Sequence, residues 1–186
     1  MFVAVIHNSN NTERYERLLK ELEVQGITDY QIFPAIHYVT SVKQGINHAH
    51  KSVIEYAAMA EFDEVCVMED DIRFTHPKSW EFFLANKPKD FDIYLGGIYL
   101  GVLLEGNRIE SFCGFHCYIV SKRFYSTFLS VPDDEHIDRC MTGLGKFVVC
   151  NPMAAIQYNG FSSNTGKDEN YDPLLNGRLL YDGTVF

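Results

Sequence analysis

The stretch Val65-Cys66-Val67-Met68-Glu69-Asp70-Asp71-Ile72 decides the fold, because an apolar run rich in β-branched residues ends there in three consecutive carboxylates. This pattern predicts a buried strand whose end delivers acidic side chains into a cleft. Side chains alternate between the two faces of a strand, so we expect Glu69 and Asp71 on one side and Asp70 on the other.

Three adjacent negative charges repel one another and need a positive group to offset them. We expect a divalent cation, because Mg²⁺ and Mn²⁺ prefer carboxylate oxygens. Glu69 and Asp71 are its predicted ligands, which leaves Asp70 for a contact with backbone or with a ribose. The competing interpretation is a surface turn of solvated acids. The apolar strand directly before the acids makes it the weaker of the two.

Length and charge limit the classes of protein that this chain can belong to. Its 186 residues, 46% of them hydrophobic, suit a single domain that spans residues 1–186. The formal net charge of −9 argues against a nucleic-acid-binding surface, which requires a basic stripe. Local basic spots that hold phosphate groups remain compatible with this charge.

Cysteine usage and hydropathy bear on the compartment. The five cysteines include no Cys-x-x-Cys pair, which favours reduced thiols over a zinc site. The apolar run over residues 2–6 is too short for a signal peptide and lacks a basic segment before it. No segment approaches the roughly 20 apolar residues that span a bilayer. We therefore expect a cytoplasmic protein without a transmembrane segment.

The rest of the chain alternates apolar strand-like runs with amphipathic helical patterns. Besides the acidic strand, strands are predicted over residues 2–6, 30–36, 91–97, 115–120, 147–150 and 154–158, and a hairpin over 98–104 and 108–112. Helices are predicted from a Thr12 cap to Gly26, over 45–60, from Pro77, over 122–129, and from 133 to about 144. The alternation predicts an α/β fold with a mostly parallel central sheet and an antiparallel excursion.

Two histidines of the helix over residues 45–60 are predicted to point in opposite directions. The apolar residues of this helix share one face, His50 falls within it, and His48 lies opposite. A histidine on the packed side needs a hydrogen-bond partner. His50 is therefore either a satisfied core residue, which the spacing favours, or a side chain that reaches the cleft beside the acidic strand.

Four stretches, in this order, resemble glycosyltransferase family 25, whose members include bacterial lipopolysaccharide galactosyltransferases and animal collagen galactosyltransferases. The first is similar to a Gly-x-x-x-Ser-His segment, with Ala49 in place of the serine. The second is similar to a Leu-Glu-Asp-Asp-Val metal motif, the third to an Asp-hydrophobic-hydrophobic-Leu-Gly strand, and the fourth to a Gly-Thr-His-Ala-Tyr segment with Phe115 in place of the threonine. The stretches are residues 45–50, 67–72, 91–96 and 113–121.

The resemblance covers roughly residues 1–165 and implies a GT-A fold, which is a Rossmann-type three-layer sandwich. It also implies a metal-dependent hexosyltransferase that moves a sugar, with UDP-galactose as the expected donor, to a glycan or lipid-linked acceptor. The opening of the chain departs from the family, because His7-Asn8-Ser9-Asn10-Asn11 stands where a double arginine is usual, with Arg14 three residues on.

The resemblance also implies roles for individual residues. Mn²⁺ or Mg²⁺ would be held by Glu69 and Asp71. Asp138, in a stretch similar to the family's Pro-Val-Asp, would be the catalytic base. Glu135 and Asp134, near the same predicted helix start, are the alternatives. His116 lies between apolar residues and is either a packed strand histidine or, as the resemblance implies, an acceptor-side residue. The expected donor-binding residues are His7, Asn8, Asn11, Arg14, His50, Asp70, Gln157 and Ser162.

Three hypotheses follow from these patterns. The first is a metal-dependent, inverting glycosyltransferase. The second is a GT-A-like module that binds a nucleotide or a glycan without turnover, and the missing arginines favour it. The third, a metal-dependent phosphoesterase, would need more His and Asp ligands than the sequence groups together. In any of these, the polar tail over residues 161–186 is a candidate lid over the cleft.

Overall fold

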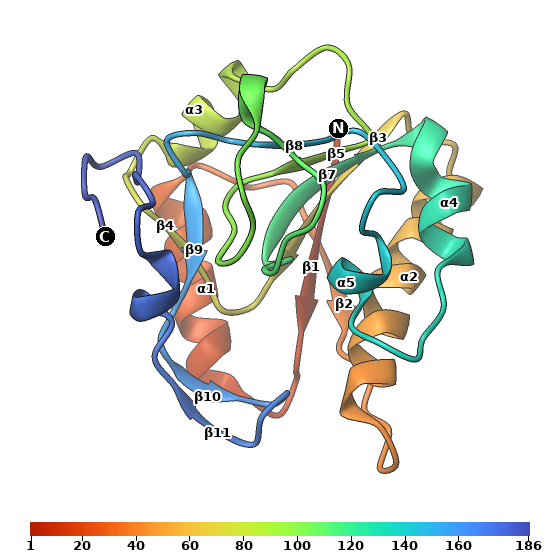
Figure 1. The fold of residues 1–186 in the computed structure, drawn as a ribbon. Helices are drawn as coiled ribbons and strands as arrows, with labels where there is room; N and C mark the ends of the chain where they lie inside the picture. Colours follow the sequence, from red (N-terminus) through yellow and green to blue (C-terminus); the bar gives the residue numbers. More distant parts are fainter.

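The computed structural model describes residues 1–186 and has a seven-stranded sheet at its centre (Figure 1). Five strands run in one direction, whereas β7 and β6 run antiparallel to their neighbours. The predicted mostly parallel sheet with an antiparallel excursion is therefore confirmed. Across the sheet the order is β2 (Gln31–Pro34), β1 (Phe2–His7), β3 (Glu64–Glu69), β7 (Cys117–Ser121), β5 (Ile93–Leu95), β8 (Phe147–Val149) and β6 (Arg108–Ile109).

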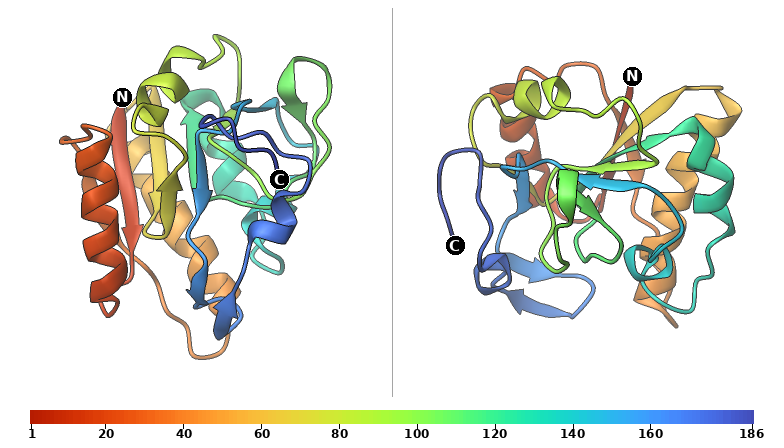
Figure 2. Two further views of the ribbon diagram at one scale, coloured as in Figure 1. Left: turned by 90° about the vertical axis from the view of Figure 1, so that its left-hand side faces the viewer. Right: turned by 45° about the horizontal axis from the view of Figure 1, so that its top comes forward.

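Helices cover both faces of this sheet, which gives the expected three-layer α/β/α sandwich (Figures 1 and 2). On one face, α1 (Thr12–Val24) and α3 (Ser79–Ala85) pack against the sheet in a core of 18 buried residues. On the other face, α2 (Val42–Met59), α4 (Tyr125–Ser130) and α5 (Ile137–Cys140) contribute to a core of 30. None of the helices is both long and apolar enough to cross a bilayer.

Strand β3 shows why the acidic turn is placed where it is. Val65 and Val67 pack into the larger core, whereas Cys66 and Met68 pack into the smaller one. All four side chains have no exposed surface, so β3 is buried on both faces, as expected of a central strand. The strand ends at Glu69, and the chain then turns through two aspartates.

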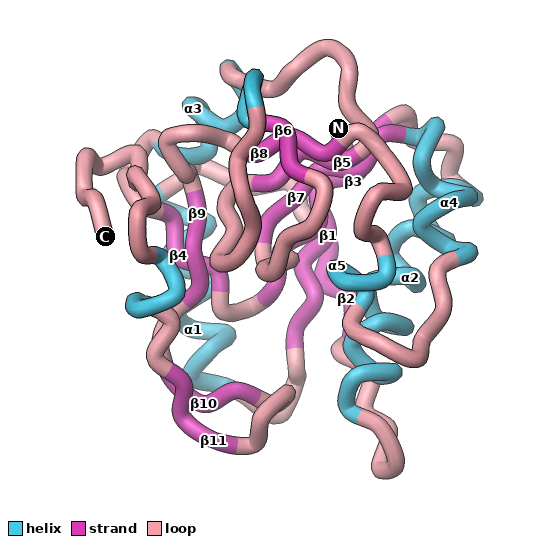
Figure 3. The backbone as a smooth tube through the Cα atoms, in the orientation of Figure 1, coloured by secondary structure: helices cyan, strands magenta, loops and turns pink.

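Two short strand pairs lie beside the main sheet (Figure 3). β4 (Ile72–Phe74) pairs antiparallel with β9 (Ala155–Gln157), and this register places Gln157 opposite Ile72, directly after the acidic turn. β10 (Gly160–Ser162) pairs with β11 (Lys167–Glu169). Short 3₁₀ turns at Glu105–Asn107, Lys122–Phe124 and Asp172–Leu175 complete the chain.

Three of the predicted elements differ in the structure. The predicted hairpin is wrong, because residues 98–104 form no strand and β6 pairs with β8, leaving one antiparallel bridge from Leu100 to Cys113. The helix predicted over 133–144 is only the four-residue α5. The N-cap of α1 is Asn11 rather than Thr12, and its side-chain oxygen accepts a hydrogen bond from the backbone N–H of Arg14.

The tail after β11 folds back onto the molecule. Leu175 and Leu180 are buried in the larger core. The Arg178 guanidinium donates hydrogen bonds to the backbone carbonyls of Tyr99 and Gly101. These contacts hold residues 171–180 against the loop that follows β5.

Candidate active site

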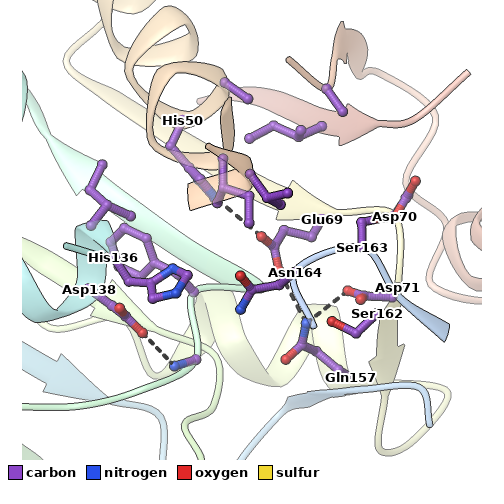
Figure 4. Close-up of a pocket in the computed structure, with 18 of the residues that line it drawn as sticks. His50, Glu69, Asp70, Asp71, His136, Asp138, Gln157, Ser162, Ser163 and Asn164 are labelled. Atoms are coloured by element: carbon purple, nitrogen blue, oxygen red, sulfur yellow. Dashed lines mark hydrogen bonds and ion pairs between the residues drawn. The ribbon is translucent and has the colours of Figure 1, made fainter. Parts of the chain in front are cut away.

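A cavity of about 370 Å³ opens at the carboxyl ends of β1, β2 and β3 (Figure 4). In α/β sheets this edge is the usual position of a ligand. The chain segments directly after each of the three strands line it, and α2, α5, β9 and the tail supply the other walls. Nine of the predicted site residues line this cavity: Asn8, Arg14, His50, Glu69, Asp70, Asp71, Asp138, Gln157 and Ser162.

Glu69 and Asp71 converge on one point of the cavity. The Gln157 Nε2 atom donates hydrogen bonds to Glu69 Oε2 at 3.3 Å and to Asp71 Oδ1 at 3.1 Å. Gln157 is itself fixed, because it pairs with Ile72 across β4 and β9 and its backbone N–H donates to the Tyr99 hydroxyl at 2.8 Å. The two acids face the same side, as the alternation along the strand predicted.

His50 lines the cavity from α2 and orients the Glu69 carboxylate. Its ring is buried and contacts Glu69 Oε1 through Nε2 at 3.1 Å and the Tyr118 hydroxyl through Nδ1 at 2.7 Å. A carboxylate only accepts hydrogen bonds, so Nε2 carries a proton and donates it to Glu69. Burial raises the pKa of Glu69, but the hydrogen bond and charge of His50 outweigh it and hold that pKa below its ordinary value. His50 is thus a satisfied core histidine that also reaches the cleft.

Asp71 is in the opposite electrostatic situation. Burial, and after it the charge of Glu69, raises the pKa of Asp71 to about 7. The ion pair with Arg14 acts against this rise and does not cancel it. A cation bound beside Asp71 would lower this pKa and favour the carboxylate form.

These residues fit a divalent cation. Glu69 and Asp71 aim carboxylate oxygens at a common point, because both accept a hydrogen bond from the Gln157 Nε2 atom. No group of three or more His, Cys, Asp or Glu side chains is arranged to hold a metal. Two carboxylates with further ligands from substrate phosphates and water are a common way of holding Mg²⁺.

Asp70 points away from Gln157 and ties the acidic turn to the segment after β1 (Figure 4). Its carboxylate accepts hydrogen bonds from His7 Nδ1 at 2.8 Å, from the Asn8 backbone N–H at 3.0 Å and from Arg14 Nη1 at 2.8 Å. The expected backbone contact of Asp70 is therefore present, and both of its carboxylate oxygens accept hydrogen bonds from the protein.

Arg14 reaches across from α1 to both aspartates. Its Nη1 atom lies 2.8 Å from Asp70 Oδ1 and 3.1 Å from Asp71 Oδ2, and Nη2 donates to the Phe161 carbonyl at the start of the tail. Only 15% of the Arg14 side chain is exposed. The arginine expected to hold donor phosphates is thus engaged by the protein's own acids.

Asp138 lies across the cavity from the acidic turn, in the first turn of α5 (Figure 4). Its carboxylate accepts hydrogen bonds from the backbone N–H groups of Gly114 at 3.1 Å and Arg139 at 2.9 Å. Gly114 has φ +115°, a conformation that a side chain would strain, so glycine is needed for this approach. Burial, with a smaller contribution from the Asp138 charge, raises the pKa of the neighbouring Cys113 thiol to about 11.

Four predicted site residues do not line the cavity. His7 supports Asp70 from behind, and Asn11 is used as the cap of α1. Glu135 is exposed and accepts hydrogen bonds from Lys43 and from the backbone N–H of His136. His116 is wholly buried, donates from Nε2 to the Ala155 carbonyl at 3.1 Å, and has a pKa lowered by burial. The acceptor-side role of His116 and the alternative base role of Glu135 therefore find no support in this geometry.

The sequence reasoning missed several lining residues. Ala35, Ile36, Val42 and Ile46 form an apolar wall, and Ser163, Asn164, Tyr171 and Leu174 bring the tail into the cavity. The Tyr171 ring stacks on Tyr99, with centroids 5.1 Å apart. The polar run after Phe161 was a usable signal for the tail, whereas no local pattern marks Tyr99.

Comparison with solved structures finds similar folds at low sequence identity. The crystal structure of A197 from STIV matches 90% of this chain and 93% of its own, with a TM-score of 0.53 and 14% identity. HddC from Yersinia pseudotuberculosis matches over 80% and 89%, with a TM-score of 0.51 and 13% identity. At these identities the likeness shows a shared α/β fold and nothing finer.

No protein-family model matches the chain, and no curated protein matches it in sequence. The likeness to glycosyltransferase family 25 therefore rests on the four sequence stretches alone. Of these, residues 45–50, 67–72 and 113–121 all reach the cavity, through His50, the acidic turn and the segment Cys113–Phe115.

Proposed function

We propose that this protein is a glycosyltransferase that moves a hexose, with UDP-galactose as the first donor to test, to a hydroxyl group of a glycan or lipid-linked acceptor in the cytoplasm. The observation that carries the proposal is the convergence of Glu69 and Asp71 in a cavity at the carboxyl end of the central strand. The motif resemblance supports the choice of hexose and of donor nucleotide.

The acidic turn is proposed to hold Mn²⁺ or Mg²⁺ together with the donor's diphosphate. Glu69 and Asp71 would supply carboxylate ligands, and the Gln157 side chain, which contacts both, would turn its carbonyl oxygen to the same point. When bound, the ion supplies positive charge that stabilises the leaving diphosphate. His50 holds Glu69 in a fixed orientation throughout.

Asp138 is the proposed general base. The acceptor hydroxyl oxygen forms a bond to C1 of the sugar as the bond from C1 to the diphosphate oxygen breaks, and the hydroxyl proton passes to the Asp138 carboxylate. The backbone N–H groups of Gly114 and Arg139 hold that carboxylate toward the cavity from the wall opposite the acids. Attack from that side would invert the configuration at C1.

The remaining donor contacts are proposed for Asn8 and Ser162, which line the same cavity. Residues 161–186 would serve as a lid, because Ser163, Asn164 and Tyr171 lie against the site while Leu175 anchors the segment in the core. Closure of such a segment excludes water from the reacting groups.

The direct test is turnover. The protein is incubated with UDP-galactose and Mn²⁺, with and without acceptor hydroxyl compounds, and released UDP is measured. Release that requires Mn²⁺ and is lost in Asp138→Asn supports the proposal. Binding of UDP without any release, across a panel of UDP-hexoses and acceptors, would contradict it.

The second candidate function is a GT-A-like module that binds a nucleotide or glycan without turnover. The observation that favours it is Arg14, which pairs with Asp70 and Asp71 in the structure. It predicts UDP or glycan affinity that is unaffected by Asp138→Asn, with no released product.

A further inference from the structure

Arg14 occupies a position that matters for any cation at the acidic turn. It extends from the first turn of α1, and its Nη1 atom contacts Asp70 and Asp71 together. Two adjacent carboxylates pair with this one guanidinium, which is largely buried beside them. Arg14 is therefore an internal counter-cation that neutralises part of the turn.

Both carboxylate oxygens of Asp71 are already used. Oδ1 accepts a hydrogen bond from Gln157 and Oδ2 forms an ion pair with Arg14 Nη1, each at 3.1 Å. A divalent ion held by Asp71 takes one of these oxygens at roughly 2.0–2.2 Å, and there it lies directly beside a group that already contacts that oxygen. Gln157 adapts by turning its amide to present the oxygen, since an amide has a donor end and an acceptor end.

Arg14 has no such option. A guanidinium has only donors and keeps its charge, so near a divalent ion it is repelled rather than turned. It is tethered beside the cavity by Nη2, which donates to the Phe161 carbonyl one residue before Ser162. A displaced Arg14 head group thus remains at the wall of the cavity, where a planar fork of donors suits a diphosphate.

We infer that Arg14 competes with the divalent cation for Asp71 and, once displaced, binds the diphosphate of a nucleoside-diphosphate ligand. This inference rests on the proposed function for the identity of the ligand, and the competition itself does not depend on a nucleotide. Arg14 then has opposite effects in two states. It weakens cation binding to the free protein and strengthens nucleotide binding to the cation-loaded protein.

The test begins with Mn²⁺ alone, titrated by calorimetry and by electron paramagnetic resonance into wild type and Arg14→Gln. Removal of a unit charge next to Asp71 should tighten Mn²⁺ binding by about tenfold, after allowance for solvent screening. Lys20→Gln removes the same charge from an exposed position on α1 and is the matched control. Its Mn²⁺ affinity should stay within about twofold of wild type.

The second step adds UDP to each protein at saturating Mn²⁺. Arg14→Gln should bind UDP about tenfold more weakly than wild type, because it has lost a charge-assisted contact with the diphosphate. Arg14→Lys keeps the charge without the fork and should lie between the two in both titrations. Circular dichroism checks that each variant is folded. If Arg14→Gln does not fold, Arg14→Lys takes its place in both titrations.

The outcomes separate the two proposals. Equal Mn²⁺ affinities in wild type and the Arg14 variants, or no Mn²⁺ binding by any of them, would overturn the competition. Tighter Mn²⁺ binding in Arg14→Gln together with unchanged UDP affinity would overturn the second half of the inference. If Mn²⁺ binding tightens as expected but wild type binds no UDP, the competition stands and the proposed function fails.

Discussion

The two acidic walls of the cavity hold their carboxylates in different ways. At the end of β3, the acids contact other side chains: Asp71 meets Arg14 and Gln157, and Glu69 meets Gln157 and His50. On α5, the Asp138 carboxylate is held by two backbone N–H groups. Side-chain partners can be exchanged for a ligand, whereas backbone donors fix an orientation. The first wall is therefore suited to take up a cation, and the second to present a base.

The largest expected effect on ligand binding comes from the wall at the end of β3. Asp71→Asn keeps the size of the side chain and removes the charge that the cation needs. It should weaken Mn²⁺-dependent UDP binding by about 100-fold or more, since a close ion–carboxylate contact is lost. The fold should persist. Burial disfavours the charged form of Asp71, so a neutral side chain is tolerated there, and Arg14 is the one cation that loses an ion pair with it. Calorimetry with Mn²⁺ present measures the UDP affinity. An unchanged UDP affinity would mean that Asp71 does not hold the ion.

A change at Asp138 on α5 should alter the turnover rate rather than the affinity for UDP. Asp138→Asn retains the hydrogen-bonding shape of the side chain but cannot take a proton. Turnover should fall by about 10²–10⁴-fold, the usual contribution of a general base. UDP affinity should stay within about twofold, because Asp138 is proposed to touch the acceptor and not the nucleotide. Wild-type turnover in this variant would show that Asp138 is not the general base.

A smaller effect is expected from the support beneath the first wall. His50→Ala removes two buried hydrogen bonds and leaves Glu69 and Tyr118 short of partners. The free energy of unfolding should drop by about 2–4 kcal/mol, from the lost bonds and the space left behind. Urea denaturation followed by circular dichroism measures it.

His48→Ala is the matched control on the same helix. The His48 side chain is 39% exposed and contacts Tyr38 and Asp133 near the surface. Its loss should cost at most about 1 kcal/mol, as for exposed ion pairs. A larger loss for His48 than for His50 would mean that the packed side of α2 is assigned wrongly.

The smallest expected effect concerns Cys113, which lines the cavity beside Asp138. Burial raises the pKa of this thiol to about 11, so it remains protonated at pH 8 and should react slowly with iodoacetamide. Labelling followed by peptide mass spectrometry should show a rate that still rises about tenfold per pH unit between pH 9 and 10. A rate that levels off near pH 9 would mean an ordinary thiol and a more solvated α5 wall.

Sequence patterns predicted the first wall much better than the second. The strand that ends at Glu69, the shared direction of Glu69 and Asp71, and the packed side of His50 all follow from local periodicity, which a chain shows within a few residues. The mostly parallel sheet with its antiparallel excursion follows from the alternation of strands and helices, whereas the three layers were implied by the family resemblance.

Long-range pairing explains what the sequence did not predict. Gln157 meets the acids because β9 pairs with β4 across more than 80 residues, and no pattern near Gln157 indicates that register. The segment over residues 98–104 carries strand-like apolar residues, yet β6 pairs with β8 instead. The acids at 133–135 are typical of a helix start, but they bond to Lys43, His48 and Lys51 of α2, and the helix begins only at Ile137.

The central claim is that Glu69 and Asp71 together hold a divalent cation that in turn holds a nucleoside diphosphate. Crystals of the wild-type protein grown with Mn²⁺ and UDP test it most directly, through anomalous diffraction at the manganese absorption edge. We predict an anomalous peak between the two carboxylates, at about 2.2 Å from an oxygen of each, with the UDP diphosphate in contact with it. UDP bound in the cavity with no manganese between Glu69 and Asp71 would contradict the account.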